Sequence, residues 1–198
     1  LAQLIGIDGP IPPCEVHPEP TVLARARASL NHLPQMPSPL IGLHISARKP
    51  SQRWPAERFV ELARRLHAEF DAAFLLFWSP GAEDNPQHPG DDNKARRIID
   101  GTTGLPLLPF PTAELPQLIA GLSLVDRLIC SDGGAMHIGA GLGKPIVCFF
   151  GQSGLTQWRT LRGIAAGVAA SGGCQRRAGA DGVSSAPCSG NTSRQHRR

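Results

Sequence analysis

The chain has no tyrosine, only three lysines and few aromatic residues, which make up 5% of its 198 residues. No apolar run approaches the roughly 18 to 20 residues needed to cross a bilayer, and no basic stretch followed by an apolar one opens the sequence. We therefore expect neither a membrane span nor a signal peptide. We expect a cytoplasmic location. With 41% hydrophobic residues, the composition suits a globular domain with a buried core and excludes collagen, coiled coil and wholesale disorder.

Excess positive charge is missing from most of the chain. Residues 1–162 hold 15 Lys+Arg and 15 Asp+Glu, whereas residues 163–198 hold five Arg and one Asp. The whole net charge of +4 therefore lies in the last segment. A neutral body lacks the electrostatic footprint of a duplex-binding protein. We expect no nucleic-acid partner.

Metal-binding and nucleophile motifs are also lacking. The five cysteines form no CxxC pair and no Cys/His cluster at zinc spacing, and Cys130 and Cys148 lie in apolar runs, as expected of reduced, buried thiols. There is no G-x-S-x-G elbow and no Walker P-loop. The run His88-Pro89-Gly90-Asp91-Asp92 has ligand-type side chains, but without a second spaced pair it indicates a solvated loop. We predict no metal and no cofactor.

Both ends of the sequence are unusual. It begins with Leu1 and soon reaches Pro10-Ile11-Pro12-Pro13, so we interpret residues 1–39 as a linker and the remnant of a preceding domain. In residues 163–198, Gly, Ala, Ser and Arg make up 24 of 36 positions, with no leucine and no aromatic residue. Such a segment buries too little apolar surface to offset its ordering entropy, which predicts a low-complexity, disordered tail.

The bias of 17 arginines against three lysines is typical of a GC-rich gene. Because out-of-frame GC-rich DNA encodes mainly Gly, Ala, Arg, Ser and Pro, one hypothesis is that the tail is a frameshift product. A genuine flexible tail is the alternative. The coding DNA distinguishes them, since a frameshift requires a periodic, leucine-containing continuation in another frame.

Between the ends, strands alternate with helices. The helix that opens at Pro55 carries one apolar face, Phe59, Leu62, Ala63, Leu66 and Phe70. Two prolines, 106 and 109, make the third strand irregular or an edge, and Thr112 is a plausible cap for the next helix. The predicted strands are residues 40–46, 73–78, 105–110, 125–131 and 145–150, and the predicted helices are 55–70, 94–99, 112–122 and 135–142.

Repeated βα units of this length predict an α/β fold, a Rossmann-like parallel sheet over residues 40–162 with helices on both faces. Ligands of such sheets bind outside the carboxyl ends of the strands. The loops that follow the predicted strands should therefore share one edge, and candidate site residues are sought there.

The turn Ser131-Asp132-Gly133-Gly134-Ala135-Met136-His137 is the best candidate site. Two glycines at a helix N-terminus let an anion approach the exposed N–H groups, where the helix dipole favours negative charge. Asp132 could accept hydrogen bonds from ligand hydroxyls or simply cap the helix. His137 is close enough to reach a bound phosphate, with a satisfied core histidine as the alternative.

The loop after the first strand supplies a hydroxyl and positive charges. Ser46, Arg48, Lys49 and Arg53 suit a diphosphate if they face the glycine turn, although basic loop residues are often only solvated. Trp54 is interpreted as a packing anchor. Gly151, with Gln152 and Ser153, could line the same edge or form a plain turn.

Several of these segments together resemble a known family. Ser46-Ala47-Arg48, Arg53-Trp54-Pro55, Asp132-Gly133-Gly134-Ala135-Met136-His137 and Pro145-Ile146-Val147-Cys148-Phe149-Phe150-Gly151 are similar, in order and spacing, to the C-terminal half of the lipopolysaccharide core heptosyltransferases of glycosyltransferase family 9. The likeness covers residues 40 to about 159.

The resemblance implies a GT-B architecture of two Rossmann-like domains, of which the C-terminal one binds the sugar-nucleotide donor, here ADP-heptose. The intact enzyme would transfer heptose with inversion and without a metal to the lipid A-core oligosaccharide. Its catalytic base would be a carboxylate of the N-terminal domain, which has no counterpart in this chain, so the catalytic residue is unknown. The acceptor implies a peripheral position at the inner face of the bacterial inner membrane.

Carried over by motif, Asp132 would contact the donor sugar, Gly133, Gly134 and His137 would hold the diphosphate, and Ser46 would supply a hydroxyl. Two departures stand out. The family lysine two residues before the Trp-Pro pair is Gln52 here, so that Arg53, Arg48 or Lys49 would have to supply the charge. The Trp-x-Pro continuation expected after Gly151 appears instead as Trp158-Arg159-Thr160.

We therefore expect an incomplete, inactive donor-binding fragment of a heptosyltransferase. Three alternatives stay open: a non-catalytic nucleotide-sugar-binding remnant, a GT-B transferase or epimerase that uses a UDP-sugar, and a plain α/β domain whose glycine turn binds no anion. The position of the transferred heptose and the oligomeric state are not predicted.

Overall fold

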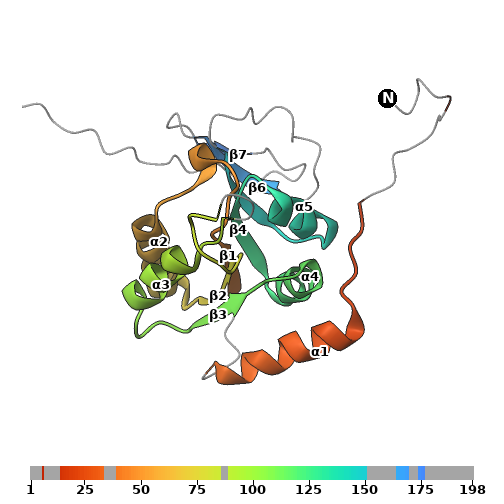
Figure 1. Cartoon of the computed structure of the whole chain (residues 1–198), viewed down its shortest axis with the longest axis horizontal. Coiled ribbons are helices and arrows are strands. Elements are labelled where there is room, and N and C mark those ends of the chain that lie inside the picture. Colours follow the sequence, from red (N-terminus) through yellow and green to blue (C-terminus); the bar gives the residue numbers. More distant parts are fainter. Residues whose placement is uncertain are drawn as a thin grey trace, which may run out of the picture.

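The structure is a computed structural model, and it describes residue 6 and residues 14–33, 39–85, 89–150, 164–169 and 174–176. Among these residues the strands form one seven-stranded sheet in the order β3-β2-β1-β4-β5-β6-β7 (Figure 1). The pairs from β3 to β6 are parallel, and β7 is antiparallel to β6. The strands are β1 (Leu40–His44), β2 (Ala73–Trp78), β3 (Leu107–Pro111), β4 (Arg127–Ser131), β5 (Ile146–Phe150), β6 (Ile164–Ala169) and β7 (Cys174–Arg176).

The described helices cover both faces of the sheet. They are α1 (Pro20–Ser29), α2 (Ala56–Phe70), α3 (Asp92–Gly101), α4 (Leu115–Leu124) and α5 (Gly134–Gly141), with the short 3-10 turns η2 (Leu30–His32) and η3 (Pro50–Gln52). In Figure 1, α2 and α3 lie on one side of the strands, and α1, α4 and α5 lie on the other. None of these described helices is long and apolar enough to cross a bilayer. The predicted Rossmann-like α/β fold is confirmed.

Strand β2 shows why both faces are covered. All six of its residues are buried, and successive side chains alternate between two cores. Phe74 and Leu76 pack with the core under α2 and α3, whereas Leu75 and Phe77 pack with the core under α4 and α5. A continuous apolar run is expected for a strand that is buried on both sides.

The order of the strands creates a switch point. The chain runs from β1 through α2 to β2 and through α3 to β3, and then α4 carries it back to β4 on the other side of β1. Ligands of open α/β sheets bind in the crevice where the strand order reverses in this way. In this molecule that crevice lies beyond the carboxyl ends of β1 and β4.

The edge position predicted for the third strand is confirmed. Among the described strands, β3 pairs with β2 alone, and its other side carries prolines at 109 and 111. The N–H of Phe74 donates to the carbonyl of Pro106, and that of Thr112 donates to the carbonyl of Trp78, so even-numbered residues face β2. The two prolines therefore face away from β2. Because proline has no N–H group, this side of β3 offers no hydrogen-bond donor to another strand at these positions.

Two details of the helices were predicted wrongly. Helix α4 is capped by Glu114, which forms a capping box with Gln117, and not by Thr112. The Thr112 hydroxyl instead donates to the carbonyl of Trp78 at the end of β2, 3.1 Å away. Phe70, predicted on the apolar face of α2, is the last residue of the helix and is 52% exposed.

Regular structure also occurs in the two end segments. Helix α1, which was not predicted, lies within residues 1–39 and packs against α4, and Ala26, Leu30 and Leu33 are buried there. In the segment predicted to be a tail without strands, β6 pairs with β5 and β7 pairs with β6. Residues 164–169 and 174–176 thus extend the sheet, although the sequence analysis assigned no strand to them. The other residues after 150 lie outside the described part.

Candidate functional site

The two predicted halves of the site meet at the switch point. Gln52, in the loop after β1, donates from Nε2 to Oδ2 of Asp132, in the turn after β4, over 2.7 Å. Gln52 is 8% exposed, so the bond is sheltered from water. The backbone N–H of Asp132 also donates to the carbonyl of Phe149 on β5. Asp132 therefore ties the glycine turn both to the loop after β1 and to the next strand.

The loop after β1 presents Ser46 at the edge of the sheet. The Ser46 Oγ accepts a hydrogen bond from the N–H of Ser79, which follows β2, over 2.9 Å. Because the oxygen acts as acceptor, its own proton is available for a ligand oxygen. Arg53 is half-buried, and its Nε donates to the carbonyl of Ala47 over 2.9 Å. Arg48 and Lys49 are exposed.

The turn after β4 leaves room for a ligand. A Cβ at Gly133 or Gly134 would meet no atom within 4 Å, and both residues are exposed. The φ of Gly133 is 164°, which is extended backbone open to any residue. Neither packing nor conformation within the described residues requires glycine here. What the two glycines do provide is close access to the N-terminal N–H groups of α5.

The N-cap residue of helix α5 is Gly133 and not Asp132, which precedes it. The Asp132 carboxylate stays at the carboxyl edge, held by Gln52.

The remaining predicted residues lie as follows. His137 is half-buried as the fourth residue of α5, on the same short helix as the glycine turn. Gly151 lies outside the described residues, as do Gln152, Ser153 and His88. Asp92, part of the run with ligand-type side chains, accepts hydrogen bonds from Trp78 Nε1 and from the N–H of Gly81. It has a structural role in the loop after β2.

Trp54 anchors the loop that carries Gln52 and Arg53. Its ring stacks on Phe149 with centroids 4.2 Å apart and meets Phe59 edge-on at 4.9 Å. Such aromatic pairs contribute about 0.5 to 1.5 kcal/mol each beyond the area that they bury. The predicted role of Trp54 as a packing anchor is confirmed.

Lys94 was missed by the sequence analysis. It lies in the first turn of α3, is 8% exposed, and donates from Nζ to the carbonyl of Ile45 over 2.7 Å. Its Nζ also lies 5.2 Å from the centroid of the Phe59 ring. A usable signal was present in the sequence. Lys94 stands four residues before the buried Ile98, so the helical period places it on the apolar face.

Three buried polar atoms of the described residues have no hydrogen-bond partner, and all belong to this edge. They are Nδ1 of His44, Oδ1 of Asp91 and Oγ of Ser131. Burial, helped by the charge of Lys94, lowers the pKa of His44 to about 4, so its ring is neutral at pH 7. Unsatisfied buried polar atoms are few in folded proteins, and each costs free energy. Within the described ranges no three His, Cys, Asp or Glu side chains gather as metal ligands would.

Comparison with known proteins agrees with the resemblance. The family model for glycosyltransferase family 9 (heptosyltransferase) matches residues 1–181. Lipopolysaccharide heptosyltransferase 2 of Escherichia coli is 27% identical over 116 residues, which are 58% of this chain and 32% of that protein. The chain thus spans about a third of the length of this curated relative.

Solved structures share the fold. A glycosyl transferase of family 9 from Veillonella parvula has a TM-score of 0.59 at 23% identity, covering 71% of this chain and 38% of that one. ADP-heptose LPS heptosyltransferase II of E. coli has a TM-score of 0.58 at 20% identity, covering 75% of this chain and 43% of that one. Because the family model covers nearly the whole sequence, the chain belongs to glycosyltransferase family 9.

Proposed function

We propose that this chain is the donor-binding half of a lipopolysaccharide core heptosyltransferase and that it binds ADP-heptose at the switch point. The observation that carries the proposal is the open glycine turn at the N-terminus of α5, tied through Asp132 and Gln52 to the loop that presents Ser46. A related fold, the E. coli heptosyltransferase WaaC, is described with ADP-2-deoxy-2-fluoro heptose, at a TM-score of 0.54 and 17% identity.

The proposed roles follow from the chemistry of each group. The N–H groups of Gly134 and Ala135 would donate hydrogen bonds to the diphosphate oxygens, and the dipole of α5 favours their negative charge. Ser46 would donate its free proton to a phosphate oxygen, and Asp132 would accept from a sugar hydroxyl. In transfer, these groups would stabilise the departing ADP, while a base outside the described residues activates the acceptor hydroxyl. No metal is part of this proposal.

The whole reaction needs the acceptor, which we propose to be the lipid A-core oligosaccharide at the cytoplasmic membrane surface. We further propose that the 198-residue chain alone binds donor without transferring heptose. Incubation of the purified chain with ADP-heptose and a lipid A acceptor should give no heptosylated product by mass spectrometry. Product formation would overturn this part of the proposal and leave the donor site in place.

Donor binding is tested by calorimetric titration of the full chain with ADP, UDP and GDP. We expect ADP to bind most tightly, and Gly134→Ala to weaken it at least tenfold, because a methyl group would stand where the diphosphate approaches. The same substitution should leave the unfolding free energy unchanged or raise it by up to about 1 kcal/mol, since alanine is the better helix former.

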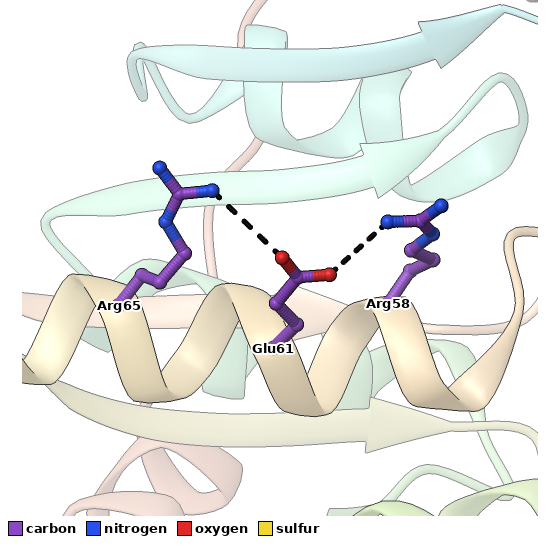
Figure 2. A network of polar contacts seen from close by, with 3 residues as sticks. All are labelled: Arg58, Glu61 and Arg65. Carbon is purple, nitrogen blue, oxygen red and sulfur yellow. Dashed lines mark hydrogen bonds and ion pairs between the residues drawn. The ribbon is translucent and has the colours of Figure 1, made fainter. Parts of the chain in front are cut away.

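A surface arginine supplies the matched control. Arg65 and Arg58 flank Glu61 on the exposed side of α2, with N–O distances of 3.8 and 3.1 Å (Figure 2). Arg65→Ala removes one positive charge from an exposed helix surface and should leave ADP affinity unchanged. Preference for UDP would favour the UDP-sugar alternative, and a folded chain that binds no nucleotide would refute the proposed function.

A further inference from the structure

Lys94, on α3, contacts the loop that follows β1. Its ammonium donates to the carbonyl of Ile45, and the Arg53 guanidinium donates to the carbonyl of Ala47. Ser46 stands between these two carbonyls. Lys94 of α3 and Arg53 of the same loop therefore hold the residues on either side of Ser46.

Burial of the Lys94 ammonium costs free energy of desolvation, and no ion pair among the described residues offsets it. Within the described residues, no carboxylate oxygen lies within 4.0 Å of its Nζ. The charged and titratable groups that face it are Arg53 before α2, Glu83 after β2, Asp91 before α3 and His44 on β1. Burial lowers the pKa of Lys94 to about 8, against the opposing influence of Asp91. A buried charge without a close partner is a frequent mark of a functional position.

The arginines on the outer face of α2 make the contrast clear. Arg58 and Arg65 have side chains that are 63% and 78% exposed, and both contact Glu61 (Figure 2). A solvated charge of that kind contributes little to stability or to binding elsewhere. Lys94 is enclosed, so its field is weakly screened and extends to the carboxyl edge of β1.

We propose that Lys94 is a positioning residue for the donor diphosphate, which holds the loop around Ser46 and places a buried positive charge behind it. The inference deepens the proposed function and rests on it. Gln52 carries no charge and is committed to Asp132, and Arg48 and Lys49 are exposed. Within the described residues, Lys94 and Arg53 are therefore the cations whose side chains donate to the backbone on either side of Ser46.

The test compares two lysines that make the same contact at opposite edges of the sheet. Lys144 donates from Nζ to the carbonyl of Ser123 over 2.8 Å, and burial lowers its pKa as well. It precedes β5, at the amino edge, away from the proposed site. ADP affinity is measured by calorimetry for the wild-type chain, Lys94→Met and Lys144→Met between pH 7.5 and 9.5.

The expected result separates the two lysines. At pH 7.5, Lys94→Met should weaken ADP binding about tenfold, and Lys144→Met should leave it unchanged. The wild-type affinity should fall as the pH rises above about 8, because Lys94 loses its charge there. This decline should be absent in Lys94→Met and retained in Lys144→Met. Equal affinity and equal pH profiles for wild type and Lys94→Met would overturn the inference.

A second measurement covers the case in which Lys94→Met does not fold. ADP beside a cation raises the pKa of that cation, so the wild-type chain should take up protons on binding ADP at pH 8.5. Calorimetry in two buffers of different ionisation enthalpy measures this uptake, and its absence would overturn the inference. If the wild-type chain binds no ADP at all, the proposed function fails, whereas normal ADP binding with no Lys94 effect refutes only this inference.

Discussion

The two edges of the parallel sheet differ in whether their buried polar atoms have hydrogen-bond partners. At the amino edge, Oδ2 of Asp126 accepts from the N–H of Leu40 over 2.8 Å, and Lys144 caps the carbonyl of Ser123. At the carboxyl edge, by contrast, His44, Asp91 and Ser131 each have a buried polar atom without a partner among the described residues. Among the described residues, both edges contain satisfied polar groups, and the buried polar atoms without a partner occur at the carboxyl edge.

This difference separates residues that stabilise the fold from residues available to a ligand. A satisfied hydrogen bond contributes about 0.5 to 1.5 kcal/mol to stability, and an unsatisfied buried group costs about 1 to 3 kcal/mol. Substitutions at the amino edge should therefore lower the unfolding free energy and leave ligand affinity unchanged. At the carboxyl edge, the buried groups without partners should lower the stability of the unliganded chain and remain available to a ligand. Three substitutions test this, beginning with the largest expected effect.

His44 should make the protein sensitive to acid. Its pKa is about 4 in the folded state and 6.5 ordinarily, so the folded state binds fewer protons. Above pH 6.5 the ring is neutral in both states. As the pH falls from 6.5 towards 4, the unfolded state gains protons first, and stability should fall by about 3 kcal/mol from this group.

Denaturant unfolding of wild type and His44→Gln between pH 7.5 and 4 measures that loss. The difference between their unfolding free energies should change with pH in the stated direction, since glutamine does not titrate. A constant difference across this range would show that the ring is not held neutral by the fold.

Asp126 tests the amino edge. Asp126→Ala leaves the N–H of Leu40 without its acceptor and should lower the unfolding free energy by about 2 kcal/mol. Asp126→Asn keeps an acceptor oxygen and should recover most of the loss. ADP affinity should stay the same in both variants, and a weakening of ADP binding would contradict the division of roles between the edges.

Ser131 should give the smallest effect. Its hydroxyl is buried with no partner among the described residues, so Ser131→Ala removes an unsatisfied group and should raise the unfolding free energy by up to about 1 kcal/mol. Thermal or denaturant unfolding without nucleotide measures this. A loss of more than about 1 kcal/mol would indicate that the hydroxyl already contributes to the stability of the unliganded fold.

Much of the fold could be predicted because it is encoded locally. The apolar run of β2 and the period of the apolar residues in α2 depend on neighbours a few positions away, and the structure places both elements within one residue of the prediction. The edge position of β3 followed from its prolines. Helix α1 was missed because its apolar pattern is weak, and its packing against α4 depends on residues about 95 positions away.

The residues of the candidate site also divide into those that local sequence predicts and those that it does not. The glycine turn after β4 and Ser46 were predicted as candidates because their residue types and their place after a strand are visible in short segments. The bond between Gln52 and Asp132 was not, since it joins residues 80 positions apart. Lys94 was read only as the start of a helix, although its spacing from Ile98 indicated a buried position.

The sequence by itself determined the alternation of strands and helices, the parallel sheet and the family, because periodicity, strand-end turns and motif spacing are properties of short segments. Only the tertiary structure decided which side chains complete one another at the carboxyl edge. Lys94 reaches Ile45 over 49 positions because the path of the chain brings the start of α3 beside the end of β1. Contacts of that kind depend on the order and packing of whole elements, which no short segment encodes.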